Sequence, residues 1–191
     1  MRALATWSGA IAGLLLIMAG SLVQAGVPQP TFDGALRVIT IPSSLQVPAL
    51  LLTALVCGPR SALLAAVAYI SLGLSQLSVF QGGGGLGYVL EPGFGYLAGF
   101  LPASWLSGRL AQQQGMNHLM SLFSASLVGL AALQLCGIAN LLIGAAAGRW
   151  GPNLWAHLFT YSLAPLVPQI LMCCPVALLA LGLRRLLLIG P

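Results

Sequence analysis

The sequence predicts an all-α polytopic membrane protein, organised as a single domain over residues 1–191 with six membrane-spanning helices. Of its 191 residues, 59% are hydrophobic and only 5% are charged, whereas soluble domains carry about 25% charged residues. The apolar runs are continuous and rich in Leu, Ala and Gly. They lack the alternation of polar and apolar residues that is typical of a membrane β-barrel.

An apolar segment of about 20 residues can cross the hydrocarbon core of a bilayer. The sequence offers six candidates, at residues 4–25, 45–57, 61–80, 94–110, 116–147 and 160–183. The second is short and has Pro42 and Pro48 at its start, which predicts a kinked or re-entrant entry. The fifth is long enough to tilt or to emerge from the bilayer.

The first segment has an alternative interpretation as a cleavable secretory signal. Arg2, the apolar run and the small-residue pattern at 23–25 are typical of such signals. The apolar run is longer than a usual signal core, however, which favours a retained helix.

The distribution of arginines predicts the orientation, since positively charged loops stay in the cytoplasm. A cytoplasmic N-terminus places five arginines inside: Arg2, Arg60, Arg109, Arg184 and Arg185. The outer side then receives Arg37, Arg149, Asp33 and Glu91. We therefore expect a multi-pass plasma-membrane protein with both termini in the cytoplasm and an outer glycine-rich loop at 81–93.

Several classes of activity are disfavoured. No charged residue falls near the middle of a predicted span, which argues against proton-coupled or ion-coupled transport. The stretch "QGGGGLGY" lacks the lysine of a nucleotide-binding loop. His118 and His157 fall on opposite sides of the membrane in this topology, so they form no shared site. We predict no enzyme, cofactor, metal site or nucleic-acid partner.

Uncharged polar side chains collect at the outer ends of the predicted spans. They are Gln46, Gln81, Tyr96, Asn140, Tyr161 and Gln169. Amides are costly in lipid unless they find partners, so these residues form either helix-to-helix hydrogen bonds or the lining of a cavity. An apolar pocket with convergent amides and tyrosines suits a small ligand with an apolar body and an amide-like head.

The glycine-rich loop is the second candidate feature. Gly82, Gly83, Gly84 and Gly85 permit a close approach of the backbone to a ligand and leave peptide groups free as donors. We interpret the loop as a flexible lid over the cavity. The alternative is a simple flexible connection.

An ordered series of motifs carries a resemblance to a known family. It comprises "ITIPSSLQVP" at 39–48, "GPR" at 58–60, "AYISLGLSQLSVFQGGGGLGY" at 68–88 and "EPGFGYLAGF" at 91–100. The chain resembles the BioY family, the substrate-binding S components of biotin transporters in the energy-coupling-factor (ECF) group. The resemblance implies an S-component-like bundle of six helices, biotin as ligand, and import powered by an ECF transmembrane subunit with two ATP-binding subunits.

The sixth segment departs from the family pattern. Many members resemble Pro-Gly-Asp-x-x-Lys where this chain reads "PQILMC", with Gln169, Ile170 and Cys173 in those places. The candidates for binding a carboxylate are then Arg149, Arg37 or the amides of the glycine loop. We expect Glu91 to order the loop or to cap the following helix. Another small vitamin or precursor as ligand, and a noncatalytic scaffold, stay open as alternatives.

A stripe of small residues on the first segment is a candidate docking surface for the transmembrane partner. Ala5, Gly9 and Gly13 recur every fourth residue, a spacing that lets helices approach closely. The alternative is packing against the chain's own helices.

Overall fold

The computed structural model describes residues 2–30, 36–75, 79–80, 83–150 and 153–187, with only the backbone described at residue 2 and from 24 to 43. Its helices are α1 (Arg2–Leu22), α2 (Gln46–Leu74), α3 (Phe94–Ala98), α4 (Phe100–Ala111), α5 (Leu119–Ala146), α6 (Leu154–Leu158) and α7 (Ala164–Leu186). A 3-10 turn at Leu86–Leu90 precedes α3, and a π-helical turn at Phe159–Leu163 joins α6 to α7. Two strands, β1 (Gln24–Pro30) and β2 (Leu36–Ser44), complete the described elements.

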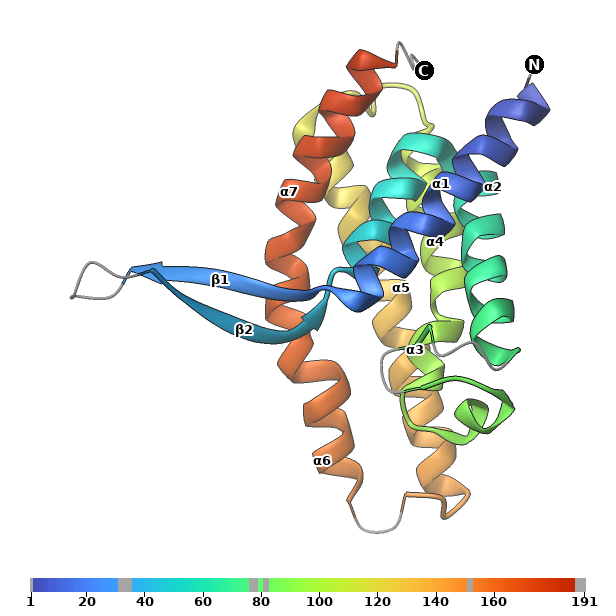
Figure 1. The fold of residues 1–191 in the computed structure, drawn as a ribbon, viewed down its shortest axis with the longest axis vertical. Coiled ribbons are helices and arrows are strands. Elements are labelled where there is room, and N and C mark those ends of the chain that lie inside the picture. The colour runs from blue at the N-terminus through green and yellow to red at the C-terminus, as the bar shows by residue number, and fades with distance from the viewer. Residues whose placement is uncertain (1, 31–35, 76–78, 81–82, 151–152, 188–191) are drawn as a thin grey trace.

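Helices form the body of the protein, and α1 packs on α2 while α4 lies between α2 and α5 (Figure 1). Helix α7 packs on α5 and α2. Four helical stretches of the described chain are long and apolar enough to cross a membrane: Ala3–Leu22, Gln46–Leu74, Leu119–Ala146 and Leu154–Leu186. The predicted all-α membrane bundle is thus confirmed, but the count of six spans is not.

Helix α2 accounts for much of this difference. Segments 45–57 and 61–80 were predicted as separate spans, and the structure joins most of them into one element that folds back at Gly58. Gly58 has φ 83° and ψ 176°, a backbone conformation that favours glycine. Pro59 follows at the start of the second half of α2. Its missing N–H costs nothing there, because the first N–H groups of a helix have no partner within the helix.

Contacts with α1 show that the two halves of α2 lie side by side. A Cβ atom at Gly13 would lie 2.3 Å from Cγ2 of Thr53 and 3.2 Å from Cβ of Ala65. In a straight helix these two residues would be about 18 Å apart. The chain therefore reverses at Gly58, between the predicted segments 45–57 and 61–80. Pro48 lies in the first turn of α2 without a kink, because its missing N–H costs nothing there.

The β-hairpin was not predicted. Strands β1 and β2 pair antiparallel, with Val27 opposite Ile39 and Gln29 opposite Arg37. Residues 38–41 read Val-Ile-Thr-Ile, a β-branched run that favours a strand, and the flanking prolines oppose a helix. Helix α1 consequently ends at Leu22, and the hairpin projects sideways from the bundle (Figure 1).

Two of the three residues of the stripe on α1 face the inside of the protein. Gly9 and Gly13 are buried, and a Cβ at Gly9 would lie 3.0 Å from Cβ of Cys57. Ala5 alone of the three is exposed. The structure thus assigns Gly9 and Gly13 to the intramolecular packing that the sequence left open, because small residues let α1 approach both halves of α2.

One buried arginine fastens the end of the bundle that carries both termini. Arg184 is 5% exposed, and its guanidinium donates hydrogen bonds to the carbonyl oxygens of Ala111 at 2.9 Å and Met116 at 3.1 Å. These carbonyls lie at the connection from α4 to α5. The buried cation therefore ties that connection to the end of α7.

Replacing Gly13 with valine tests the α1–α2 contact. The added side chain would overlap Thr53, and we expect Gly13→Val to lower the free energy of unfolding by about 1–3 kcal/mol. Gly182→Val is the matched control, because nothing lies within 4 Å of a Cβ at that position. Thermal unfolding of the two purified variants in detergent gives the comparison, and equal stability would contradict the packing described here.

Candidate functional site

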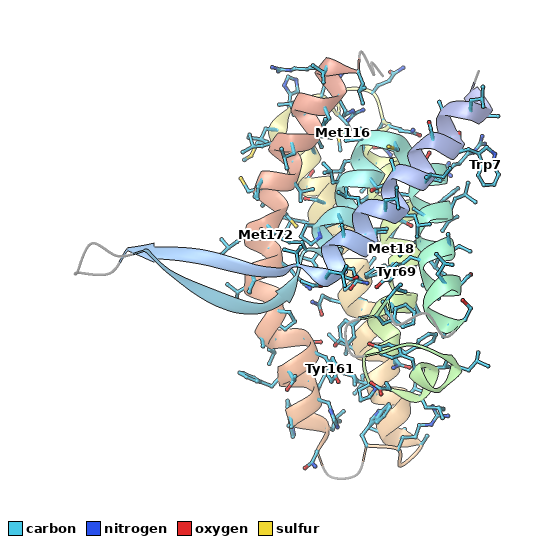
Figure 2. The ribbon with its side chains drawn as sticks, viewed as in Figure 1. Trp7, Met18, Tyr69, Met116, Tyr161 and Met172 are labelled. Atoms are coloured by element: carbon cyan, nitrogen blue, oxygen red, sulfur yellow. The ribbon has the colours of Figure 1, made fainter. Side chains whose placement is uncertain are left out.

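A cavity of about 370 Å³ lies among the start of α2, the 3-10 turn, α3, α4, α5 and the helices at the C-terminal end of the chain. Its lining consists of Ser44, Gln46, Val47, Tyr88, Gly93, Tyr96, Leu97, Phe100, Leu133, Thr160, Tyr161, Pro165 and Gln169. Every side chain in this set is uncharged. Figure 2 places Tyr161 in the half of the molecule away from Trp7 and the termini.

Four of the predicted site residues meet in this lining: Gln46, Tyr96, Tyr161 and Gln169. They come from α2, α3, the π-helical turn and α7. The rings of Tyr96 and Tyr161 stack with their centroids 6.3 Å apart. Residues that are far apart in the sequence are thus brought to one cavity.

The polar groups also bond to one another, as the alternative interpretation expected. Nε2 of Gln134 donates to Oε1 of Gln169 at 3.0 Å, and the Tyr96 hydroxyl shares a hydrogen bond with the hydroxyl of Ser162. These bonds fix the orientation of Tyr96 and Gln169. Gln169 therefore both forms a helix-to-helix hydrogen bond and lines the cavity.

Three buried polar atoms are left without a hydrogen-bond partner among the described residues; one is Nε of Arg184, at the other end of the bundle, and two belong to this site. The two at this site are Nε2 of Gln46 and Oε1 of Gln134. A buried donor or acceptor without a partner costs about 1–3 kcal/mol. Gln46 lines the cavity, so a ligand with a hydrogen-bond acceptor could satisfy its donor, whereas Gln134 lies behind Gln169 and outside the lining.

Several polar residues of the site were missed from the sequence. Gln134, Tyr88, Thr160 and Ser162 were not among the predicted residues. Gln134 carried a usable signal, because it is an amide within an apolar span, as is Asn140. Tyr88 and Ser162 had no such signal, since their positions depend on the turns before α3 and α7.

Asn140 and Arg149 do not line the cavity. Nδ2 of Asn140 donates to the carbonyl of Pro92 at 3.3 Å, and a Cβ at Gly95 would lie 2.2 Å from Cβ of Asn140. This amide therefore ties the connection before α3 to α5. Arg149 is exposed in the turn after α5.

The described glycines of the loop lie beside the cavity lining rather than in it. Gly83 and Gly85 have φ of 137° and 95°. The N–H of Gly83 donates to Phe80 and that of Gly85 to Gly73. These two peptide groups are thus occupied, in contrast to the free donors expected from the sequence. Gly84 is also absent from the lining, and Gln81 and Gly82 lie outside the described residues.

An aromatic anchor holds this loop. Phe80 is 4% exposed and lies 4.8 Å from the ring of Tyr88 and 5.5 Å from that of Tyr69, measured between centroids. The Tyr69 hydroxyl donates to the carbonyl of Val79 at 2.8 Å. The loop is therefore fastened to α2 directly before the glycines begin.

Glu91 acts through its backbone in the described structure. Its carbonyl accepts a hydrogen bond from the N–H of Phe94, whereas the cap of α3 is Gly93 without a side-chain bond. Burial raises the pKa of the Tyr88 phenol, and the nearby Glu91 carboxylate raises it further. The Tyr88 hydroxyl thus stays protonated at neutral pH and faces the cavity as a donor.

The chain matches the model of the BioY family over residues 3–188. It belongs to the BioY family. The resemblance seen in the sequence motifs is thereby confirmed.

Two individual proteins are similar in sequence to this BioY-family chain. Over 119 residues, 62% of the chain, it is 29% identical to a Lysinibacillus sphaericus protein named "Probable biotin transporter BioY"; the match spans 61% of that protein. It is also 27% identical over 148 residues to an uncharacterized 21.2 kDa protein of Cyanophora paradoxa, covering 75% of the chain and 74% of the relative.

A solved structure shares the fold. The crystal structure of the S-component for biotin from an ECF-type ABC transporter superposes with a TM-score of 0.67 and 17% sequence identity, covering 96% of this chain and 90% of the other. This similarity extends over almost the whole BioY-family chain. It shows that the chain shares the fold of that structure.

Replacing Gln46 with leucine tests whether its buried amide serves a ligand rather than the fold. Since Nε2 lacks a partner, we expect Gln46→Leu to raise the free energy of unfolding of the ligand-free protein by about 1–3 kcal/mol. Gln114→Leu, at an exposed position outside the cavity, is the control. A loss of stability in thermal unfolding of Gln46→Leu would show that the amide supports the fold.

Proposed function

We propose that this BioY-family chain is the membrane subunit that binds biotin and that it imports biotin together with an ECF-type energising module. The observation that carries this proposal is the neutral, partly polar cavity with an unpaired amide donor. The family match and the names of the relatives support the choice of ligand. The proposed role is binding and translocation, not catalysis.

The size of the cavity supports a single small guest. Ligand sites range over about 300–1,000 Å³, and this cavity, at about 370 Å³, lies near the lower end. The ureido ring of biotin offers a carbonyl acceptor, which suits the unpaired Nε2 donor of Gln46 in the lining. Val47, Leu97 and Leu133 provide apolar walls for the thioether ring.

The carboxylate of biotin needs a different place, because no described side chain of the lining is a cation. We assign it to the rim. The ring centroids of Tyr161 and His157 lie 6.2 Å apart, and those of His157 and Trp150 lie 6.0 Å apart. Trp150 follows the exposed Arg149 in the sequence. Arg149 is therefore the favoured cation; the side chain of Arg37 and the peptides of Gln81 and Gly82 lie outside the described residues.

The proposal includes six passes through the membrane. The halves of α2 on either side of Gly58 and the pair α3–α4 supply the passes that add to α1, α5 and the C-terminal helix. Both termini lie at the same end of the bundle in Figure 1, as an even number of passes requires. Five of the seven arginines belong to that end in the predicted topology, which supports a cytoplasmic location.

Energy is proposed to come from the partners that the family resemblance implies, an ECF transmembrane subunit and two ATP-binding subunits. Ala5 stays available for docking because it is exposed. Gly9 and Gly13 contribute by shaping the α1–α2 pair.

A second candidate is the import of another small vitamin or a precursor on the same scaffold. The departure in α7 favours it, since Ile170 and Cys173 stand where many members resemble an aspartate and a lysine. A ligand without a carboxylate would fit the uncharged lining directly.

Equilibrium binding of labelled biotin to the detergent-purified chain tests the proposal. We expect saturable binding that unlabelled desthiobiotin reduces and that thiamine and riboflavin do not. Gln169→Ala should weaken binding about tenfold, because it removes one amide and releases Gln134. Gln114→Ala should bind as the parent chain does.

The outcomes separate the candidates. Saturable binding of labelled thiamine or riboflavin, without saturable binding of biotin, would favour the second candidate. A chain that binds none of these compounds, with Gln169→Ala and Asn140→Ala unfolding as the parent chain does, would favour a noncatalytic scaffold.

Cysteine labelling in intact cells tests the orientation. In a background without the four native cysteines, a membrane-impermeant maleimide should label Leu86→Cys, which is 76% exposed as leucine. Gln114→Cys, exposed at the other end, should react only after permeabilisation. The reverse pattern would place the termini outside and overturn the topology.

A further inference from the structure

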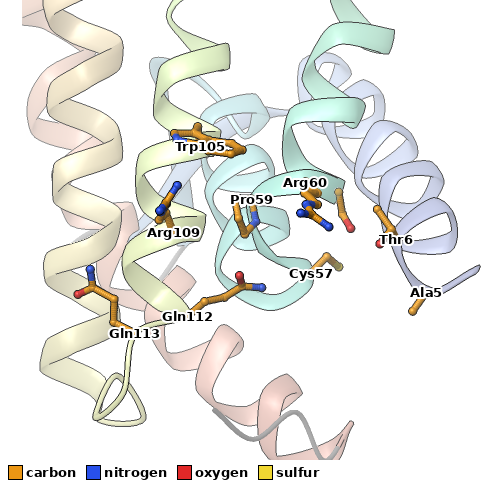
Figure 3. A pocket seen from close by; sticks show the side chains of 10 residues that line it. Ala5, Thr6, Cys57, Pro59, Arg60, Trp105, Arg109, Gln112 and Gln113 are labelled. Carbon is orange, nitrogen blue, oxygen red and sulfur yellow. The ribbon is translucent and has the colours of Figure 1, made fainter. Parts of the chain in front are cut away.

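A second, larger cavity lies at the end of the bundle that carries the termini (Figure 3). It measures about 770 Å³ and is lined by Ala5, Thr6, Cys57, Pro59, Arg60, Ser61, Trp105, Arg109, Gln112 and Gln113. These residues come from α1, the turn of α2, α4 and the start of the α4–α5 connection. It shares no lining residue with the proposed biotin site.

The charge of this second cavity is positive. Arg60 and Arg109 both line it, and neither forms an ion pair with a described residue. The only acidic side chain among the described residues is Glu91, which lies before α3. Two arginines without a carboxylate partner at one cavity make a site for an anion.

The fold holds these cations in place. The guanidinium of Arg109 lies 5.7 Å from the centroid of the Trp105 ring, a cation–π contact that orients it. Gly108 brings α4 against the turn of α2, since a Cβ there would lie 2.7 Å from Cα of Pro59. Arg109 follows Gly108 in α4, and Arg60 follows Pro59 in α2. The close contact between Gly108 and Pro59 therefore places both arginines at one cavity.

Amide donors supplement the charge. A Cβ at Gly58 would lie 2.1 Å from Nε2 of Gln112, so the side chain of Gln112 rests on the α2 turn because that position is glycine. Gln113 also lines the cavity. Amides beside guanidinium groups provide the neutral donors that complete the hydrogen bonding of a phosphate.

The surroundings indicate which phosphate compound fits. Trp105 is 38% exposed and the next residue, Leu106, is 41% exposed, while Leu4, which precedes the lining residue Ala5, is 77% exposed. Tryptophan and exposed aliphatic side chains beside arginines are typical of the boundary between headgroups and acyl chains. A soluble phosphate would gain nothing from this apolar border, whereas the acyl chain of a lipid would cover it.

We propose that this cavity binds the phosphate headgroup of an anionic phospholipid. Arg60 and Arg109 hold the phosphate oxygens, Gln112 and Gln113 add neutral hydrogen bonds, and the acyl chains lie along the exposed side chains near Trp105. Basic pockets between membrane helices bind anionic headgroups in this way. The inference is independent of the identity of the imported ligand.

Native mass spectrometry of the full chain in detergent tests this proposal. Phosphatidylglycerol and phosphatidylcholine with identical acyl chains are added in separate titrations. We expect one phosphatidylglycerol to bind in preference to phosphatidylcholine. The double variant R60Q/R109Q should bind it about thirtyfold more weakly, since each basic residue contributes roughly fivefold. The control Arg149→Gln removes an exposed arginine in the turn after α5 and should leave lipid binding unchanged.

Two further arms make the result decisive. Inorganic phosphate in excess should not displace the lipid; displacement at equal concentration would identify a free-phosphate site and overturn the lipid assignment. Equal binding of phosphatidylglycerol to the parent chain and R60Q/R109Q would overturn the site itself. If R60Q/R109Q keeps full lipid binding but loses only association with the energising module, the surface is a protein-docking site. Unchanged thermal unfolding of R60K/R109K with retained lipid preference would show that charge, rather than folding, is responsible.

Discussion

The close approach of helices at glycine positions is the constraint on which the rest of this structure depends. Gly58 permits the reversal of α2, Gly13 lets α1 contact both of its halves, and Gly108 brings α4 against the turn. The chain has few charged side chains that could hold its helices together by ion pairs. The hydrophobic effect contributes little to the association of helices in lipid, because lipid tails are as apolar as the helix surfaces. Close van der Waals packing between helix backbones therefore holds the helices together.

The same packing creates a cavity whose polar atoms are not fully used. Where Tyr96 and Gln169 bond to neighbours, their orientation is fixed; where Gln46 keeps a buried donor without a partner, the folded state is less stable than it could be. Unpaired polar atoms of this kind are expected in an empty ligand-binding site, because their hydrogen bonds form only when the ligand binds. Stability of the empty protein and affinity for the guest therefore oppose each other at Gln46.

The two ends of the bundle differ in chemistry. The end with the termini carries Arg60, Arg109 and the buried Arg184, whereas the cavity near Tyr96 is lined only by neutral side chains. In the proposed function, this polarity orients the subunit in the membrane. It also separates recognition of the guest from the surface that meets anionic headgroups.

The sequence by itself determined that the protein is a helical membrane protein of the BioY type, because its composition and the order of its motifs do not depend on how the helices pack. It also marked Gln46 and Tyr96, since amides and tyrosines at the ends of apolar runs are visible without coordinates. Only the tertiary structure decided that Gln134 bonds to Gln169, that Asn140 ties the connection before α3, and that Gly9 and Gly13 face inward. Those outcomes depend on helix rotation and on the reversal at Gly58, which bring together residues whose spacing along the chain carries no sign of contact.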